Sequence, residues 1–368
     1  MSSQRIVATY HVESDALQIT ERAKGLALEQ SVECPLAAVP DPALLDSIVG
    51  RVETITELAT GRYAVRIGLA PATAPPDPGQ LINMLFGNSS IQQDVVLADV
   101  ELPETYLRAF GGPRLGLAGI RALTGARHRA LTASALKPQG LAPEALAGIA
   151  QRLALGGVDL IKDDHGLADQ AYSPFAARAV AIGRAVRDAN AVTGRHAIYA
   201  PNLSGTLDDM RRQLDIVRAE AIEAVLVAPM IVGLSNFHAI VREAAGLAVV
   251  AHPALSGVAR IAPPLLLGRL FRLFGADATV FPNFGGRFAY TPETCLALAG
   301  AARDPWHAVK PCAPMPAGGI AVDRVTELLQ FYGQDMMLLI GGALLAARER
   351  LTEEAARFVK EVAAHGNG

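Results

Sequence analysis

An eightfold repeat occupies the chain from about residue 131 onward and limits the folds open to it. Each round has a short apolar run, a cluster of Gly, Pro, Asn or Asp, and then an amphipathic helical stretch. Continuous apolar strands that alternate with helices are typical of a parallel sheet covered on both faces, and eight such units fit a closed (β/α)₈ barrel. An open, doubly wound sheet is the alternative, although no GxGxxG motif follows a first strand. The predicted strands lie at 131–138, 158–164, 196–202, 224–230, 247–253, 278–283, 307–316 and 336–342.

Residues 1 to about 125 have a different pattern. Strand-like segments at 6–12, 51–70 and 95–103 alternate with helix-like segments at 19–30 and 79–88. This mixture predicts a small α+β domain, in which the Pro-rich stretch 70–79 is a loop. We therefore expect an α/β protein with two domains: an α+β domain over residues 1–125 and a (β/α)₈ TIM barrel that carries the catalytic groups over residues 126–368.

The overall charge and the apolar runs exclude some classes of function. A formal net charge of −3 over 368 residues gives no broad attraction to a phosphate backbone, so nucleic-acid binding is set aside. The apolar runs are interrupted before they reach membrane-spanning length, and no basic-then-apolar leader is present. We expect a cytoplasmic protein without a membrane partner. The three cysteines have no CxxC spacing, which argues against a disulfide framework and a cysteine zinc site.

Polar side chains gather where the predicted barrel strands end. The segment VDLIKDDH, for example, runs from apolar residues directly into four polar ones. Because the C-terminal strand ends of a barrel face the active-site mouth, we expect these side chains to converge there. The strand-end residues are Lys137, Lys162, Asp163, Asp164, His165, Asn202, His252 and Asn283.

Lysine is rare in this chain, and two of its five lysines, Lys137 and Lys162, close successive predicted strands. A lysine at a barrel mouth is partly desolvated, which lowers its pKa and makes it a usable base or nucleophile. The alternative is a salt bridge of Lys162 with Asp163 or Asp164.

The same segment has the composition of a metal site. Asp164 and His165 suit a divalent cation, whereas a lysine ammonium cannot be a ligand. If the neutral amine of Lys162 adds carbon dioxide, the resulting carbamate is an anionic oxygen ligand, and the three residues form a plausible Mg²⁺ site. The alternative is an acidic cluster that caps the following helix.

Two glycine doublets follow the seventh and eighth predicted strands. They are Gly318-Gly319 and Gly341-Gly342. Glycines let backbone N–H groups approach an anion closely, and the loops after strands 7 and 8 are where barrels commonly hold phosphate. We therefore expect a phosphate site there.

Several segments of the chain carry a resemblance to a known family. They are, in order, GPRLGLAGIRALTGARHRAL, LKPQGL, GGVDLIKDDH, IYAPNLSG, PAGGI and LIGGAL. Through them the chain resembles the RuBisCO large-subunit superfamily over nearly its whole length. The resemblance implies that Lys162 is carbamylated and holds Mg²⁺ with Asp164 and position 165. It implies that Lys137 handles protons of an enediolate, with His252 after the fifth strand. The family residues that a partner subunit places over the site correspond to Glu29 and Asn83, which implies a homodimer with shared active sites.

The departures from this family restrict the activity. Position 165 is Glu in true RuBisCO and His here, and no lysine lies near Asn283, where carboxylation requires one. We therefore do not expect a carboxylase. The family's ligands for the far phosphate correspond to Pro253, Ala276 and Ala317, none of which can hold an anion. A substrate with one phosphate, at the C1 end, is expected.

This pattern resembles the RuBisCO-like proteins (form IV), which act on methylthio sugar phosphates of methionine salvage or methylthioadenosine metabolism. The resemblance implies isomerisation of 5-methylthioribulose 1-phosphate to 1-methylthioxylulose 5-phosphate, or enolisation of 2,3-diketo-5-methylthiopentyl 1-phosphate. The family's enolases use a lysine of the N-terminal domain as base, and none lies between Lys24 and Lys137, so the isomerase is preferred. A decarboxylase or hydrolase of another sugar-acid phosphate and a non-catalytic sugar-phosphate binder are the remaining alternatives.

Overall fold

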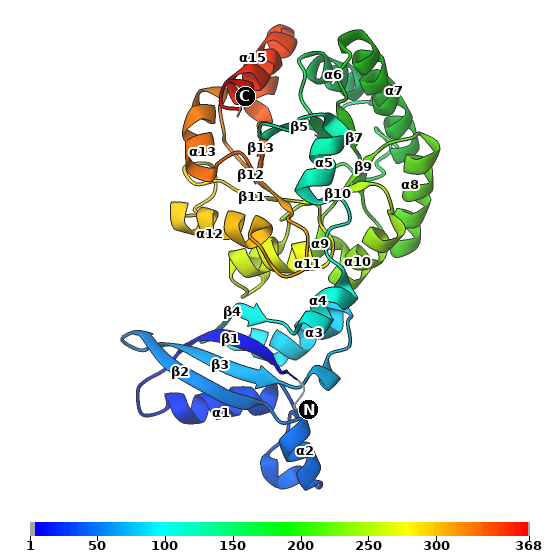
Figure 1. The fold of residues 1–368 in the computed structure, drawn as a ribbon. Helices are drawn as coiled ribbons and strands as arrows, with labels where there is room; N and C mark the ends of the chain where they lie inside the picture. Colours follow the sequence, from blue (N-terminus) through cyan, green and yellow to red (C-terminus); the bar gives the residue numbers. More distant parts are fainter. Residues whose placement is uncertain (1–3, 367–368) are drawn as a thin grey trace. The chain divides into compact units, whose positions relative to one another are not determined.

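Two units make up residues 4–366, the part of the chain that the computed structural model describes (Figure 1). One unit consists of the chain up to Gly111 together with Leu255–Leu266. The other consists of Gly112–Ala254 and the chain from Leu267 onward. The division thus falls before α5 (Gly116–Thr124) and not at residue 125. The reason is that Leu117 and Ile120 of this helix belong to the core of the second unit.

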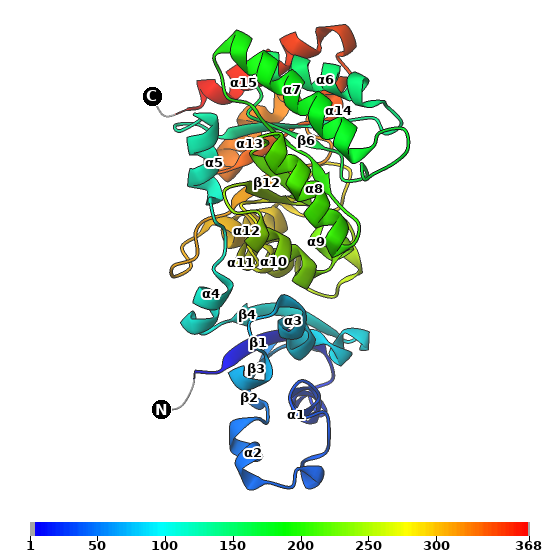
Figure 2. The same cartoon turned by 90° about the vertical axis from the view of Figure 1, so that its right-hand side faces the viewer.

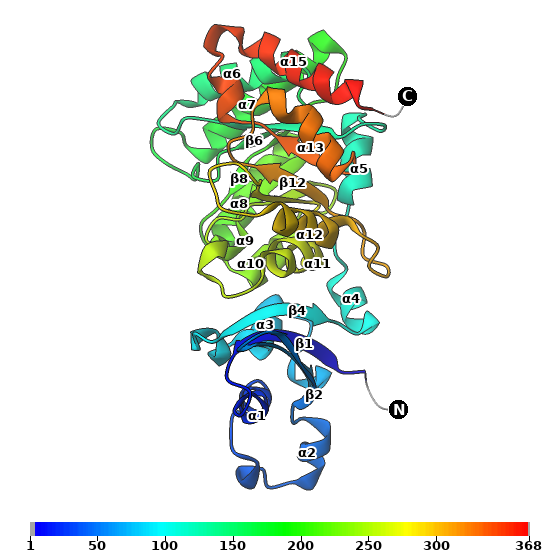
Figure 3. The ribbon, with the colours of Figure 1, turned by 90° about the vertical axis from the view of Figure 1, so that its left-hand side faces the viewer.

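The first unit is an antiparallel sheet with helices, as the strand and helix signals predicted. Its strand order is β2-β3-β1-β4, and α1 packs against β2 and β3 (Figure 3). Alternate residues of β1 are buried, which gives the sheet one core face. The segment 255–266 joins this unit because Leu97 and Arg260 share a backbone hydrogen bond of 3.0 Å. The elements are β1 (Ile6–Glu13), α1 (Ile19–Glu29), α2 (Pro42–Ser47), β2 (Arg51–Ala59), β3 (Arg62–Leu69), α3 (Pro78–Phe86), β4 (Val95–Glu101) and α4 (Glu104–Phe110).

The second unit confirms the predicted barrel of parallel strands. The hydrogen-bonded orders are β13-β5-β6-β7 and β12-β11-β10-β9-β8, and β12 lies beside β13. The third strand is split at Pro201, whose carbonyl still accepts from Leu226 N, because proline has no N–H for the ladder. The strands are β5 (Leu131–Leu136), β6 (Leu160–Asp163), β7 (Ile198–Ala200), β8 (Asn202–Leu203), β9 (Ala224–Val227), β10 (Ala248–Ala251), β11 (Ala278–Pro282), β12 (Ala313–Ala317) and β13 (Met337–Leu339).

Helices cover the outside of the barrel (Figures 1 and 3). They are α6 (Pro143–Leu155), α7 (Phe175–Thr193), α8 (Leu207–Ala219), α9 (Pro229–Val232), α10 (Leu234–Glu243), a π-helix (Pro264–Leu270), α11 (Phe271–Leu273), α12 (Pro292–Arg303), α13 (Val325–Tyr332), α14 (Gly342–Leu345) and α15 (Leu351–Ala364). Inside the barrel, buried residues of every strand but the short β8 form one core, to which α5 adds Leu117 and Ile120. Figure 2 shows α5 and α14 at opposite ends of the strands. The end near α14 is the C-terminal one, because α14 follows β13.

Between residues 4 and 366, no helix has the length and apolar character needed to cross a bilayer.

Candidate active site at the C-terminal strand ends

The end of β6 divides its polar residues between two faces. Leu160 lies in the barrel core, so Lys162, two residues later, faces the same interior, and Asp163 faces the surrounding helices. Lys162 pairs in register with Ala135 and Ala200, two small core residues that leave room for the long side chain. Its side chain is buried, and its Nζ donates a 2.9 Å hydrogen bond to the backbone carbonyl of Asp163. The salt bridge between Lys162 and a carboxylate, which the sequence left open, does not form.

The carboxylate of Asp164 pairs with Lys137 instead. One carboxylate oxygen contacts Lys137 Nζ, and the other lies 3.3 Å from Nδ1 of His165. The His165 ring stacks on the His252 ring, with the centroids 4.0 Å apart and the planes at 13°. The backbone N–H of Ala254 donates to Nδ1 of His252 at 3.1 Å. These contacts join four predicted residues that follow β5, β6 and β10: Lys137, Asp164, His165 and His252. Lys162, in β6, lies near enough for its charge to lower the pKa of both histidines.

Positive charge and burial dominate the electrostatics of this cluster. Burial, with a smaller contribution from the charge of Lys137, lowers the pKa of Lys162 to about 7. Burial and the guanidinium of Arg287 lower the pKa of Lys137. Burial and the charges of the two lysines lower the pKa of both histidines. The neutral forms of the amines and imidazoles are thus favoured here, and a neutral amine with a pKa near 7 can accept a proton near neutral pH.

The donor set fits a metal ion only if Lys162 is modified. No group of three or more His, Cys, Asp or Glu side chains within residues 4–366 is arranged to hold a metal. Asp164 and His165 supply two ligands. A carbamate on the buried, partly neutral amine of Lys162 would supply the third, an oxygen of the kind that Mg²⁺ prefers. In its protonated form, Lys137 competes with a metal ion for the Asp164 carboxylate, because both are cations.

The two glycine doublets present free amide donors. Gly318 and Gly319 have φ values of +91° and +85°, a conformation that favours glycine. They follow β12, and Gly341 and Gly342 follow the adjacent strand β13. Among the described residues, none of these four amides donates a hydrogen bond to a protein acceptor. Such clustered N–H groups form an anion-binding concavity.

The asparagines at the strand ends are used inside the protein. The Asn202 amide donates to the carbonyls of His165 and Leu167, at 3.1 and 2.8 Å. The Asn283 side chain is fully buried, where it accepts from the Tyr332 hydroxyl and donates to the Phe284 carbonyl. Both residues hold the loops that carry the site. The Oδ1 atom of Asn202 is buried without a hydrogen-bond partner in the described part of the chain, and the substrate contacts that the sequence predicts for Asn202 and Asn283 stay a prediction.

The two predicted residues of the first unit lie on two neighbouring helices, Glu29 at the end of α1 and Asn83 within α3. Glu29 ends α1 and accepts a 2.9 Å hydrogen bond from Asn88. Asn83 lies in α3, five residues before Asn88, and its side chain is exposed. The end of α1 is fixed to α3 because the Gln30 side chain donates to the Met84 carbonyl at 2.9 Å.

A buried network behind β6 was not predicted from the sequence. The Asp163 carboxylate accepts from Arg178 Nε at 3.0 Å, from the Tyr199 hydroxyl at 2.8 Å and from the Asn202 backbone at 3.0 Å. The side chains of Asp163 and Arg178 are both 0% exposed. The network fixes the strand end from which Lys162 and Asp164 project. The one sequence signal for this network was Arg178, an arginine in the first turn of α7, the helix that follows β6.

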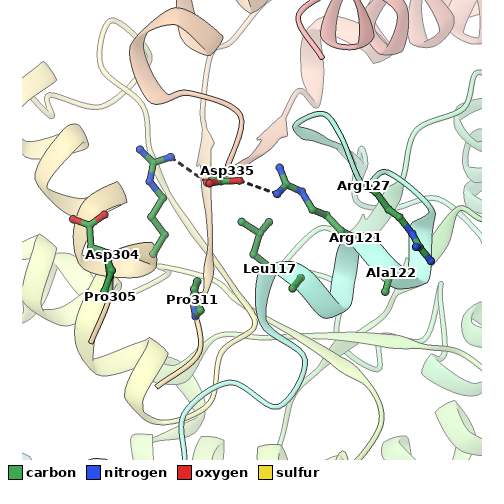
Figure 4. A pocket seen from close by; sticks show the side chains of 10 residues that line it. Leu117, Arg121, Ala122, Arg127, Asp304, Pro305, Pro311 and Asp335 are labelled. Carbon is green, nitrogen blue, oxygen red and sulfur yellow. Dashed lines mark hydrogen bonds and ion pairs between the residues drawn. The ribbon is translucent and has the colours of Figure 1, made fainter. Parts of the chain in front are cut away.

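A hollow of about 660 Å³ lies at the N-terminal end of the barrel strands, opposite the candidate site (Figure 4). It is lined by α5 and by the residues that precede β12 and β13. Arg121 donates to the Asp335 carboxylate at 2.7 Å and to the carbonyls of Arg129 and Gln334. Because these partners occupy its terminal nitrogens, we assign Arg121 a structural role. Active sites of such barrels lie at the C-terminal strand ends, so we do not expect a catalytic residue at this end.

Replacing Arg121 is expected to affect stability and not catalysis. Arg121→Ala removes three hydrogen bonds that join α5 to the segments before β5 and β13, which should lower the free energy of unfolding by about 2 kcal/mol. Urea denaturation measures this change, with kcat/KM staying near the wild-type value. Arg127→Ala is the control, because the Arg127 side chain lines the same hollow and makes no hydrogen bond or ion pair to another described residue. Equal stabilities of the two variants would contradict the structural assignment.

Comparison with known proteins places this geometry in a family. A family model described as ribulose bisphosphate carboxylase large chain, catalytic domain, matches residues 116–279. The crystal structure of a Rubisco-like protein from Rhodopseudomonas palustris is similar with a TM-score of 0.94 and 70% sequence identity, covering 100% of each chain.

Two curated relatives carry names of specific reactions. A 5-methylthioribulose-1-phosphate isomerase from Rhodospirillum rubrum is 56% identical over 98% of this chain and 97% of its own. A 2,3-diketo-5-methylthiopentyl-1-phosphate enolase from Geobacillus thermodenitrificans is 32% identical over 92% of this chain and 87% of its own. With relatives of this similarity along nearly its whole length, the chain belongs to the RuBisCO large-subunit superfamily and, within it, to the RuBisCO-like proteins.

Proposed function

We propose that this protein is an isomerase that converts 5-methylthioribulose 1-phosphate to 1-methylthioxylulose 5-phosphate. The observation that carries the proposal is the 56% identity, over nearly full length, with a protein named as such an isomerase, against 32% with a named enolase. The absence of a lysine between Lys24 and Lys137 supports the same choice. The enolase remains the second candidate because its substrate would need the same proton abstraction.

The chemistry requires only proton transfers. The carbonyl of the ketose moves from C2 to C4 in two successive shifts. In each shift a base takes the proton from the carbon beside the carbonyl, and an acid returns a proton to the former carbonyl carbon, so the formula is unchanged. We assign these transfers to Lys137, whose pKa is lowered by burial, and His252, whose ring lies beside His165.

Lys162, as its carbamate, Asp164 and His165 would hold the Mg²⁺ ion that the family implies. When bound, the ion supplies a Lewis acid that lowers the energy of the negative charge developing on the substrate oxygen. The carbamate forms when the neutral Lys162 amine adds carbon dioxide and releases one proton. The stack of His252 on His165 keeps the imidazole ligand in one orientation.

A single phosphate suits the distribution of donors at the mouth. The four glycine amides would bind the phosphate. Pro253 follows β10 and Ala317 ends β12. The resemblance places both where a RuBisCO binds its second phosphate, and neither side chain can donate a hydrogen bond, so this part of the mouth suits the uncharged methylthio group. Ala276, the third position predicted at the far-phosphate end, does not line the mouth. It precedes β11 and therefore lies at the N-terminal end of the barrel, away from the mouth.

We further propose a cytoplasmic homodimer in which Glu29 and Asn83 of one copy complete the site of the other. The half-buried side chain of Glu29 and the exposed amide of Asn83 lie on two neighbouring helices, α1 and α3, an arrangement that supports contact of both with the same site. Glu29 would act as an additional acid or base.

Deuterium exchange tests the proposed reaction. The enzyme, activated with bicarbonate and Mg²⁺, is incubated with 5-methylthioribulose 1-phosphate in D₂O, and carbon-bound protons are followed by NMR. We expect solvent deuterium in a xylulose product and none with Lys137→Met. Lys360→Met, which changes an exposed lysine of α15, is the control. Exchange only with the diketo phosphate would support the enolase, and no exchange with either substrate would contradict an enzymatic role.

A further inference from the structure

The loop after β11 places an unpaired arginine beside the glycine doublet of β12. The Arg287 backbone N–H donates to the Gly318 carbonyl at 3.4 Å. A Cβ atom built on Gly319 would lie 3.3 Å from the Arg287 nitrogen and 3.5 Å from its Cγ. A side chain at position 319 would therefore press against the loop. The close fit shows that the stem of Arg287 packs directly over the doublet.

The loop is held in this position by contacts on both sides. A Cβ atom on Gly286 would overlap the Gly318 carbonyl oxygen, so this approach requires glycine. The Phe288 ring lies 3.4 Å from the Cβ position of Gly318. On the other side, Arg324 donates to the Phe284 carbonyl at 3.3 Å. Position 287 thus has little freedom to move away from the doublet.

The guanidinium of Arg287 has no carboxylate partner among the described residues. Its one ring contact is with Phe288, whose centroid lies 5.5 Å from the guanidinium carbon. Arg324, the neighbouring arginine, is different because Glu327 neutralises it at 2.7 Å. The Arg287 side chain is exposed, yet its charge contributes to the lowered pKa of Lys137, which places the guanidinium near the barrel mouth.

A phosphate held only by amides would lack a counter-charge. Backbone N–H groups supply hydrogen bonds, but a phosphate dianion is bound more strongly when an arginine adds charge-assisted bonds. We propose that the Arg287 guanidinium is the cation that binds the substrate phosphate at the four glycine amides. This assignment rests on the proposed function, because it takes a phosphorylated ketose as the substrate. It makes Arg287 a specificity residue that separates phosphorylated from unphosphorylated sugars.

The test measures phosphate binding separately from turnover. Inorganic phosphate is titrated into the activated enzyme, and its dissociation constant is measured by phosphorus-31 NMR. Arg287→Gln should weaken phosphate binding and raise the KM of the phosphorylated ketose by about tenfold or more, with kcat within about threefold of the wild type. Arg287→Lys should recover part of the loss, because it restores the charge without the fork of donors.

Arg127→Gln is the matched control, since it removes an equal charge from the opposite end of the barrel. It should leave the phosphate affinity unchanged. Equal weakening by the two variants, or an unchanged phosphate affinity in Arg287→Gln, overturns the assignment. A wild-type protein that does not bind phosphate overturns it as well. Phosphate binding that depends on Arg287, in a protein without isomerase activity, would support the assignment while the proposed function fails.

Discussion

Lys162→Met should reduce isomerase activity by about 10³-fold or more, the largest catalytic effect expected for any single replacement in this chain. Methionine fills the same buried space at the end of β6 without an amine, so the barrel is expected to remain folded. The carbamate cannot form in this variant, and Asp164 and His165 are then too few to hold Mg²⁺. Steady-state kinetics with saturating bicarbonate and Mg²⁺ measures the loss.

A direct readout accompanies the kinetics. Carbon-13 bicarbonate should produce a carbamate signal in the NMR spectrum of the wild type and none in Lys162→Met. Lys360→Met, at an exposed position, should retain both the signal and the activity. If Lys162→Met kept activity within about tenfold of the wild type, the buried amine would not be the metal anchor.

The pH dependence of activation follows from the same lysine. Its pKa is about 7, so the neutral amine that reacts with carbon dioxide becomes dominant as the pH rises through 7. At constant dissolved carbon dioxide, the activation rate should therefore rise with pH and level off above this value. An ordinary exposed lysine would give a rate still rising at pH 9, because its unperturbed pKa is near 10.4.

The barrel was predictable because its strands are buried on both faces. That burial makes each strand a continuous apolar run. The turn residues and amphipathic helices between these runs separate them, so the number of strands can be counted. Boundaries were less predictable. The seventh strand begins at Ala313 and not near residue 307, and α5 joins the barrel because Leu117 and Ile120 fill its end. A helix that precedes the first strand carries no signal of which core it will enter.

The site was predictable at the level of strand ends but not of side-chain directions. Lys137, Lys162, Asp164, His165 and His252 meet as expected. Ala276 was misplaced because a position before a strand lies at the opposite end of the barrel from one after it. The role of Asp163 was also missed. Adjacent residues of a strand face opposite sides. In the KDD segment, Lys162 and Asp164 therefore belong to the site, and Asp163 between them anchors the strand end.

This anchor should have the largest effect on stability. Arg178→Met leaves the Asp163 carboxylate buried without its counter-charge, and removing one partner of a buried ion pair costs about 3–5 kcal/mol. The variant also loses the hydrogen bonds from Arg178 to the carbonyls of Ser173 and Ala168, at 2.6 and 2.8 Å. Urea denaturation should show the loss. The chain has one tryptophan, Trp306, in the second unit, so its fluorescence follows the unfolding of the barrel.

Arg184→Met provides the control on the same helix. Arg184 lies 3.8 Å from Asp188, and both side chains are largely exposed, so this replacement should change the free energy of unfolding by less than about 0.5 kcal/mol. A destabilisation of Arg178→Met below about 1 kcal/mol would contradict the network, since a buried charge without a partner cannot be tolerated at so small a cost. Because Asp163 fixes the strand end that carries Lys162 and Asp164, folded Arg178→Met should also bind Mg²⁺ more weakly. Arg184→Met should not, which separates a local effect on the site from a general loss of stability.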